Sequence, residues 1–191
     1  MSQDNVRREI EELQDEILAK KKRLAQLKRN ALNEEVEDYL FKDWYGNSLK
    51  LSELFGDKKD LILIHNMGKG CRYCTLWADG FNGIYPHLQS RAAFVLSSPD
   101  DPELQQEFAN GRGWKFKIVS CRDTSFARDM GFQDENGHYL PGYSVFSKTE
   151  EGRLIRHSMD WFGPGDDYCS VWHFFDLLKD GVNDWEPQYC Y

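Results

Sequence analysis

The sequence predicts an α/β fold, with a central mixed sheet flanked by helices and preceded by one long N-terminal helix. Between residues 61 and 130, short apolar runs typical of buried strands alternate with helical segments. Two strand segments separated by a turn-rich stretch follow, and then a last helical segment. Residues 4–41 carry a helical period of their own and contain neither glycine nor proline.

The first segment, residues 4–41, has apolar side chains at steps of three and four residues. These are Val6, Ile10, Leu13, Ile17, Leu24, Leu27 and Ala31, with Lys20 interrupting the series. So narrow a stripe is typical of a coiled-coil seam. The period does not distinguish a helix that lies on its own domain from one that pairs with a second copy, so a homodimer formed through this helix stays open as an alternative.

The globular part is expected to begin after a turn at residues 43–47. Its strands are short apolar runs bounded by charged or turn residues, and its helices begin at capping residues. The expected strands are an edge segment at 49–56 that leads into a helical turn, strands at 61–66, 92–97 and 116–120, and paired strands at 143–147 and 153–157. The expected helices are at 74–89, 102–110, 123–130 and 167–179. In the first of these helices, Gly80, Gly83 and Pro86 would cause a kink or an interruption. These boundaries predict a helical arm at 1–43, a domain at 44–180 and a C-terminal tail at 181–191.

Composition excludes several classes of function. The net charge is −8, and the globular part has no cluster of Lys and Arg, so a nucleic-acid partner is not expected. No apolar run approaches the roughly 18 residues of a membrane span, and the charged N-terminus does not resemble a signal peptide, so we expect a cytoplasmic protein without a membrane partner. With 40% hydrophobic residues the chain can build a core, and its five cysteines do not form an even-numbered secreted disulfide framework.

The most informative motif is Cys71-Arg72-Tyr73-Cys74, which follows a predicted buried strand and opens a helix. The amide groups and dipole at a helix N-terminus stabilise a thiolate, so Cys71 is expected to attack and Cys74 to resolve the mixed disulfide. A zinc site also uses Cys-x-x-Cys but needs two further ligands, and the other cysteines are isolated in the sequence. No metal is therefore expected.

Pro141 stands directly before a predicted strand and is followed by Gly142. It could simply start an edge strand, where proline is tolerated. Alternatively, a cis-proline held against the dithiol would form, with Gly142, a groove for an extended substrate segment. Its pairing with the upstream Cys71 motif favours the second hypothesis.

These motifs support a resemblance to known families. Residues 49–157 resemble the thioredoxin superfamily, in particular its peroxiredoxin-like branch, through the segments 51–56, 94–100 and 114–120. From about residue 30 to 180 the chain is similar to a family of bacterial thioredoxin-like proteins of unknown function, whose members are often labelled dithiol–disulfide oxidoreductases. The segments that carry this similarity are 65–67, 71–74, 77–81, 113–114, 141–146 and His157. The resemblance implies a thioredoxin-like fold and a redox-active cysteine pair that needs no cofactor.

The same resemblance bears on the reaction. Peroxidatic peroxiredoxins place a threonine three residues before the reactive cysteine, where this sequence has Gly68. We therefore expect thiol–disulfide exchange with a protein or a small-molecule thiol or disulfide. The alternatives are a peroxiredoxin-like thiol peroxidase and a non-catalytic interaction module.

Other residues are candidates for tuning the site. His65 ends the central strand, Arg72 adds positive charge, Trp77 follows the cysteines in the helix, and Asp79 is a weaker candidate for proton transfer to Cys74. The favoured alternative for His65 is a partly buried histidine with satisfied hydrogen bonds, and for Trp77 and Asp79 it is packing and solvation of the helix. The remaining cysteines are expected to be small core residues; they are Cys121, Cys169 and Cys190.

Overall fold

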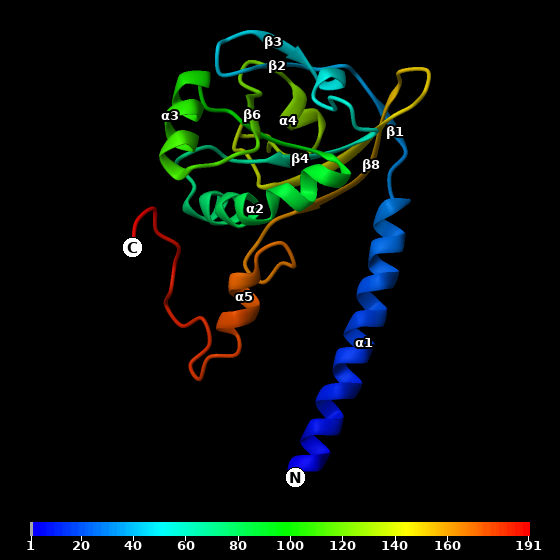
Figure 1. The fold of residues 1–191 in the computed structure, drawn as a ribbon, viewed down its shortest axis with the longest axis vertical. Helices are drawn as coiled ribbons and strands as arrows, with labels where there is room; N and C mark the ends of the chain where they lie inside the picture. The colour runs from blue at the N-terminus through cyan, green and yellow to red at the C-terminus, as the bar shows by residue number, and fades with distance from the viewer. Residues whose placement is uncertain (1) are drawn as a thin grey trace.

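A computed structural model describes residues 2–191 and confirms the predicted fold (Figure 1). One mixed sheet has the strand order β1-β8-β7-β4-β5-β6-β2-β3. The strands are β1 Glu34–Val36, β2 Leu40–Lys42, β3 Ser48–Lys50, β4 Asp60–His65, β5 Ala93–Ser98, β6 Lys117–Ser120, β7 Gly142–Lys148 and β8 Leu154–Trp161. The helices are α1 Gln3–Arg29, α2 Arg72–Arg91, α3 Pro102–Arg112, α4 Phe126–Asp129 and α5 Ser170–Phe175, with a 3-10 turn, η1, at Leu51–Glu53.

The centre of the sheet consists of the parallel strands β4, β5 and β6, and β7 and β8 continue it in the antiparallel sense. Two apolar clusters cover the two faces. One lies under α2 and α3 and contains Trp77, Phe81 and Ala109; the other lies under α4 and η1 and contains Leu51 and Phe126. Because both faces are covered, β4 and β5 consist of nearly continuous apolar runs.

This topology positions the dithiol. A parallel pair needs a crossover, so the chain leaves β4 at His65 and returns to β5 through α2. The N-terminus of α2 therefore lies at the carboxyl end of β4. The first residue of β7, Gly142, pairs with His65, so the Pro141 segment reaches the same end of the sheet.

The elements expected between residues 61 and 157 are all present within a few residues of the predicted bounds. Helix α2 continues through Gly80, Gly83 and Pro86, so the interruption that the sequence allowed is absent, and a kink at these residues stays a prediction. The last helix is shorter than predicted and ends at Phe175. It starts late because the Asp166 carboxylate accepts hydrogen bonds from the amides of Gly163, Tyr168 and Cys169 and holds residues 163–169 in a turn.

The first helix also differs from the prediction, since it ends at Arg29 and not near residue 41. Beyond Asn30 the chain turns into strands β1, which pairs with β8, and β2, which pairs with β3 and β6. Phe41 is buried in the core and Val36 packs against it, so burial in the sheet outweighs the helical preference of the polar residues around them. The division at 1–43, 44–180 and 181–191 stays a prediction, with residues 34–42 contributing strands to the sheet.

Helix α1 projects from the domain as a rod in Figure 1. It contains no buried residue. Among residues 2–191, no helix combines the length and the apolar character that crossing a membrane requires.

The close approach of three segments at Gly142 gives a stability prediction. A Cβ added there would lie 2.2 Å from the Asp160 carbonyl oxygen and 2.4 Å from a ring carbon of Phe132. Gly142→Ala is therefore expected to lower the free energy of unfolding by about 3 kcal/mol or more, as overpacking against fixed backbone does. Urea denaturation followed by circular dichroism measures this.

The matched control is Gly83→Ala in α2, where nothing lies within 4 Å of the added Cβ. This substitution should stabilise the protein by about 0.5–1 kcal/mol, because alanine has the higher helix propensity. Equal effects of the two substitutions would contradict the packing described at Gly142.

Candidate redox site

The loop between β4 and α2 requires a glycine at position 68. Gly68 has a φ of +98°, and its amide donates to the Asn66 side-chain oxygen at 2.8 Å. A Cβ at this position would lie 2.8 Å from the Asp100 carboxylate, which also accepts the Lys69 amide at 2.7 Å. A threonine would therefore be strained and would collide with Asp100. The absence of threonine noted in the sequence thus has a local structural cause.

Cys71 is the N-cap residue of α2, and its sulfur accepts the Cys74 amide at 3.1 Å. These contacts lower the pKa of Cys71 to about 6. The main cause is the hydrogen bond from the Cys74 thiol, and the amides of Cys74 and Tyr73 add to it, while partial burial opposes the shift. At neutral pH the Cys71 sulfur is therefore a thiolate.

Cys74 has the opposite character. Its side chain is buried, and its pKa is raised because its thiol donates to the Cys71 sulfur and because burial disfavours a second charge. The two sulfurs share one proton, which lies on Cys74. This asymmetry suits Cys71 for attack and Cys74 for resolution.

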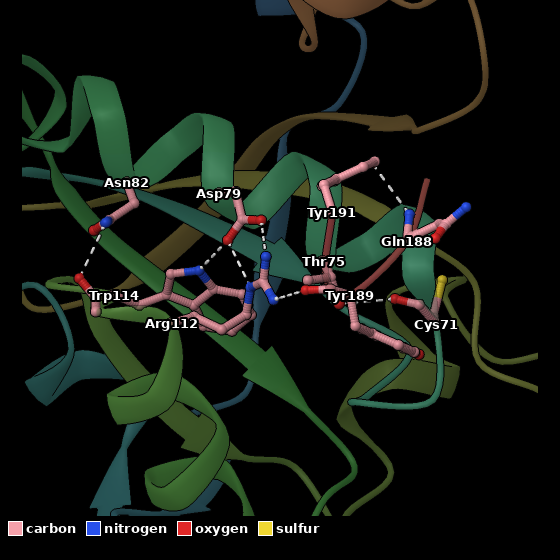
Figure 2. A network of polar contacts seen from close by, with 10 residues as sticks. Cys71, Thr75, Asp79, Asn82, Arg112, Trp114, Gln188, Tyr189 and Tyr191 are labelled. Carbon is pink, nitrogen blue, oxygen red and sulfur yellow. Dashed lines mark hydrogen bonds and ion pairs between the residues drawn. The ribbon is translucent and has the colours of Figure 1, made fainter. Parts of the chain in front are cut away.

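The C-terminal segment, residues 186–191, lies against the loop and helix turn that carry Cys71. The Tyr189 hydroxyl donates to the Lys69 carbonyl at 2.8 Å, and Glu186 forms an ion pair with Arg72 at 2.8 Å. Figure 2 shows Tyr189 beside Cys71, with Gln188 above Cys71 in this view. The segment is therefore held next to the residues on either side of Cys71.

A network of hydrogen bonds between partly buried side chains holds this C-terminal segment in place. The Asp79 carboxylate in α2 accepts hydrogen bonds from Arg112 Nε and from the Trp114 indole N–H, both at 2.8 Å. Arg112 in turn donates to the Tyr189 carbonyl at 3.0 Å (Figure 2). Asp79 is thus committed to positioning Arg112, and the prediction that it transfers a proton to Cys74 is not supported by any contact in the structure.

The structure places His65 and Trp77 in the core. The His65 ring stacks on Phe132 with centroids 3.8 Å apart and bonds to Ser144 Oγ at 2.9 Å. Burial, with a smaller contribution from Arg156, lowers its pKa well below the usual value, so the ring is neutral. Phe132 belongs to the cluster on the face opposite α2, so the contacts of the His65 ring lie on that face, and its role in tuning the dithiol stays a prediction. Trp77 is buried on the α2 face and packs at 5.3 Å from Phe162.

Arg72 and Pro141 differ in geometry from what the sequence led us to expect. The Arg72 guanidinium is directed to Glu186, and the groups that lower the pKa of Cys71 are the Cys74 and Tyr73 donors. The Pro141 peptide is trans, because residues 2–191 contain no cis peptide bond. Gly142 lies in β7 between β4 and β8, so its backbone does not line an open edge to which an extended peptide could add.

The other three cysteines differ in how far they are exposed to solvent. Cys121 and Cys169 are buried, as expected, and burial raises the pKa of both thiols. Cys190 is exposed, contrary to the prediction, because it lies in the C-terminal segment next to a pocket of about 310 Å³ lined by Lys69, Phe108 and Arg112. Within residues 2–191, no group of three or more His, Cys, Asp or Glu side chains has a metal-binding arrangement.

The place of the C-terminal segment in the site was not predicted from the sequence. Glu186 and Tyr189 lie more than 110 residues from their partners Arg72 and Lys69. The segment has no periodic pattern, so no local signal indicated where it would lie. The available hint was its aromatic composition, with Trp185, Tyr189 and Tyr191 in a short stretch.

Comparisons with known proteins agree with this fold. The family model described as "Bacterial protein of unknown function (DUF899)" matches residues 4–190. No curated protein matches the chain. Peroxidoxin BcpB from Mycobacterium tuberculosis is similar with a TM-score of 0.55 and 21% sequence identity, over 68% of this chain and 84% of that chain.

Two further solved structures are similar over most of their length. Reduced Prx3 from Vibrio vulnificus, in complex with H2O2, has a TM-score of 0.58 and 12% identity, over 71% of this chain and 89% of that chain. AhpC from Enterococcus faecalis has a TM-score of 0.56 and 19% identity, over 72% of this chain and 84% of that chain. At these identities the similarity shows a peroxiredoxin-like fold.

The hydrogen bonding at the dithiol predicts the pH dependence of its reactivity. Alkylation of Cys71 by iodoacetamide, followed by peptide mass spectrometry, should have its midpoint at about pH 6. Cys74→Ala removes the thiol donor and should move this midpoint upward, toward the ~8.5 of a free cysteine. Cys74→Ser keeps a hydroxyl donor and should move it less. An unchanged midpoint in Cys74→Ala would contradict the assigned cause.

The contacts of the C-terminal segment predict a gating effect. The double variant Glu186→Gln/Tyr189→Phe removes one exposed ion pair and one neutral hydrogen bond, which together contribute about 1 kcal/mol. Alkylation of Cys71 by a bulky maleimide should then accelerate about five-fold, while the small iodoacetamide should respond less. The control is Tyr45→Phe, because Tyr45 is 81% exposed and contacts no residue of the site. This substitution should leave the rates of alkylation by both reagents unchanged.

Proposed function

The chain belongs to the DUF899 family of bacterial proteins of unknown function, and we propose that it is a thiol peroxidase in which Cys71 and Cys74 form the redox couple. The observation that carries this proposal is the protonation pattern of the pair. Cys71 is a thiolate at neutral pH, and the protonated, buried Cys74 donates to it.

The reaction takes place in two steps. The Cys71 thiolate attacks the terminal oxygen of a hydroperoxide, the O–O bond breaks, and an alcohol or water leaves after taking a proton from solvent, so that Cys71 becomes a sulfenic acid. Cys74 then attacks the Cys71 sulfur, a disulfide forms, and the sulfenic oxygen leaves as water. An external dithiol supplies the two electrons that restore the reduced pair; at neutral pH the pair keeps one proton, on Cys74, and the dithiol's second proton goes to solvent.

Access to the sulfur favours a small electrophile over a protein disulfide. Tyr189 and Glu186 hold the C-terminal segment against the residues that flank Cys71. Gly142 lies in the interior of the sheet and the Pro141 peptide is trans, so the groove expected for an extended protein substrate lacks support. A solved relative in fold, Prx3 from Vibrio vulnificus, is in complex with H2O2, which supports the assignment of hydroperoxides as the substrate class.

The site also predicts that its rate is modest. The Cys71 amide donates to the Gly68 carbonyl at 3.1 Å, and the guanidinium groups of Arg72 and Arg112 are paired with Glu186 and Asp79. The Cys71 amide is therefore engaged, all three Arg112 nitrogens have acceptors, and Glu186 competes for Arg72 as a donor to the leaving oxygen. Since one lost donor of this kind typically costs about 100-fold in rate, the reactivity rests mainly on the thiolate itself.

A second candidate is thiol–disulfide exchange with a small-molecule disulfide. The observation that favours it is Gly68, whose conformation and contact with Asp100 exclude the threonine found in peroxidatic sites. The same Cys71 thiolate would then attack a disulfide sulfur, and Cys74 would resolve the mixed disulfide.

Single-turnover kinetics test the proposal. The reduced protein is mixed with either H2O2 or oxidised glutathione, and disulfide formation between Cys71 and Cys74 is followed by mass spectrometry. We expect H2O2 to oxidise the pair faster at equal concentration. Cys71→Ser should abolish the reaction, and Cys74→Ser should stop at a Cys71 sulfenic acid that a dimedone probe captures.

The two candidates separate cleanly in this experiment. Faster oxidation by glutathione disulfide, with a glutathione adduct on Cys71 in Cys74→Ser, would replace the peroxidase proposal with disulfide exchange. If Cys71 is alkylated with a midpoint near pH 6 but reacts with neither oxidant, the catalytic proposal fails and the interaction-module alternative stands.

A further inference from the structure

We propose that α1 is a dimerisation helix that pairs in antiparallel orientation with α1 of a second copy of this chain. The proposed contact surface, the α1 stripe, consists of Val6, Ile10, Leu13, Ile17, Leu24 and Leu27. The proposal is independent of the redox chemistry at Cys71.

The α1 stripe has no partner within its own domain. Its side chains are between 41% and 53% exposed, and no residue of the helix is buried. The helix is tied to its domain by two ion pairs, Lys21 with Asp167 at 2.6 Å and Lys28 with Asp160. A helix held at one flank in this way gains little from packing, although most helical stability in proteins comes from packing an amphipathic face. A second helix on the α1 stripe would supply this packing.

The spacing of the α1 stripe fits another helix. Ile10, Ile17 and Leu24 fall at one core position of a seven-residue repeat, and Val6, Leu13, Lys20 and Leu27 fall at the other. This is the pattern by which two helices interlock along a seam. Lys21 and Lys28, which contact the domain, lie on one flank of the seam and leave the other flank free.

The charges along α1 select the antiparallel orientation. Residues 3–16 carry six acidic side chains, Asp4, Glu9, Glu11, Glu12, Asp15 and Glu16, against two basic ones, Arg7 and Arg8. Residues 17–29 carry six basic side chains, Lys20, Lys21, Lys22, Arg23, Lys28 and Arg29, and no acidic one. An antiparallel pair places each acidic half beside a basic half, whereas a parallel pair places like charges together.

Lys20 selects the same orientation. In a parallel pair Lys20 would face the partner's Lys20 inside the seam. In the antiparallel pair Ile10 faces the partner's Leu27, Leu13 faces the partner's Leu24, and Lys20 faces the partner's Ile17, so the lysine stem covers an apolar side chain while its ammonium reaches water. This register is centred near residue 18, where the charge of the helix changes sign, and it brings Glu16 next to the partner's Arg23.

The oligomeric state of the full chain tests the pairing. Sedimentation equilibrium should give a mass of twice 22.4 kDa at micromolar concentration. Leu13→Ser should raise the dissociation constant by about 100-fold, because each dimer loses two buried leucines. Leu18→Ser is the matched control, since Leu18 is 52% exposed, as Leu13 is at 51%, but lies off the α1 stripe. A monomer at all concentrations, or equal weakening by both substitutions, would overturn the proposal.

A charge reversal tests the orientation. Arg23→Glu places a second carboxylate beside the partner's Glu16 in the antiparallel pair and should weaken it about ten-fold, and the double variant Glu16→Arg/Arg23→Glu should restore the dimer. In a parallel pair Arg23 would instead lie beside the partner's Lys28, so Arg23→Glu would strengthen association. Strengthening by Arg23→Glu would therefore rule out the antiparallel orientation. Since α1 contributes no buried residue, these variants should keep the alkylation midpoint of Cys71, which verifies that the domain is folded.

Discussion

The parallel pairing of β4 with β5 is the constraint on which the redox site depends. It requires a crossover, and α2 provides it, so the first turn of this helix must begin at the end of β4. Cys71 caps that turn, and its sulfur accepts hydrogen bonds from amides that would otherwise have no partner within the helix. The same sheet brings β7 alongside β4, and with it the Pro141 segment. The acidity of one sulfur is thus a consequence of strand order.

Periodicity and motif spacing were sufficient to predict most of the fold and the cysteine pair. Buried apolar runs identified β4 and β5, because both faces of the sheet are covered. The prediction for residues 34–42 was wrong because Val36 and Phe41 gain more from the sheet than their polar neighbours gain from a helix. Successive side chains of a strand point to opposite faces of the sheet, but the sequence alone did not show which face His65 would take. The contacts of Glu186 and Tyr189 depend on long-range packing, which leaves no local pattern.

Several polar residues near the dithiol act by positioning the chain. Asp79, which its place in the motif made a candidate for proton transfer, fixes Arg112 and Trp114. Arg112 in turn supports Tyr189. Arg72 is engaged by Glu186 at the opposite end of the same segment. The charged groups around Cys71 therefore hold the C-terminal segment beside the dithiol loop, and the hydrogen bonds that stabilise the thiolate come from Cys74 and the helix turn.

The single proton shared by the two sulfurs has an electrochemical consequence. Above about pH 6 the reduced pair holds one proton, on Cys74, and one negative charge, on Cys71. Reduction of the Cys71–Cys74 disulfide by two electrons then takes up one proton and not two. The midpoint potential of such a couple falls by about 30 mV for each unit of pH, half the slope of a dithiol that is fully protonated. Near neutrality, the hydrogen bonds that keep Cys71 a thiolate thus make the potential of the couple less sensitive to changes in pH.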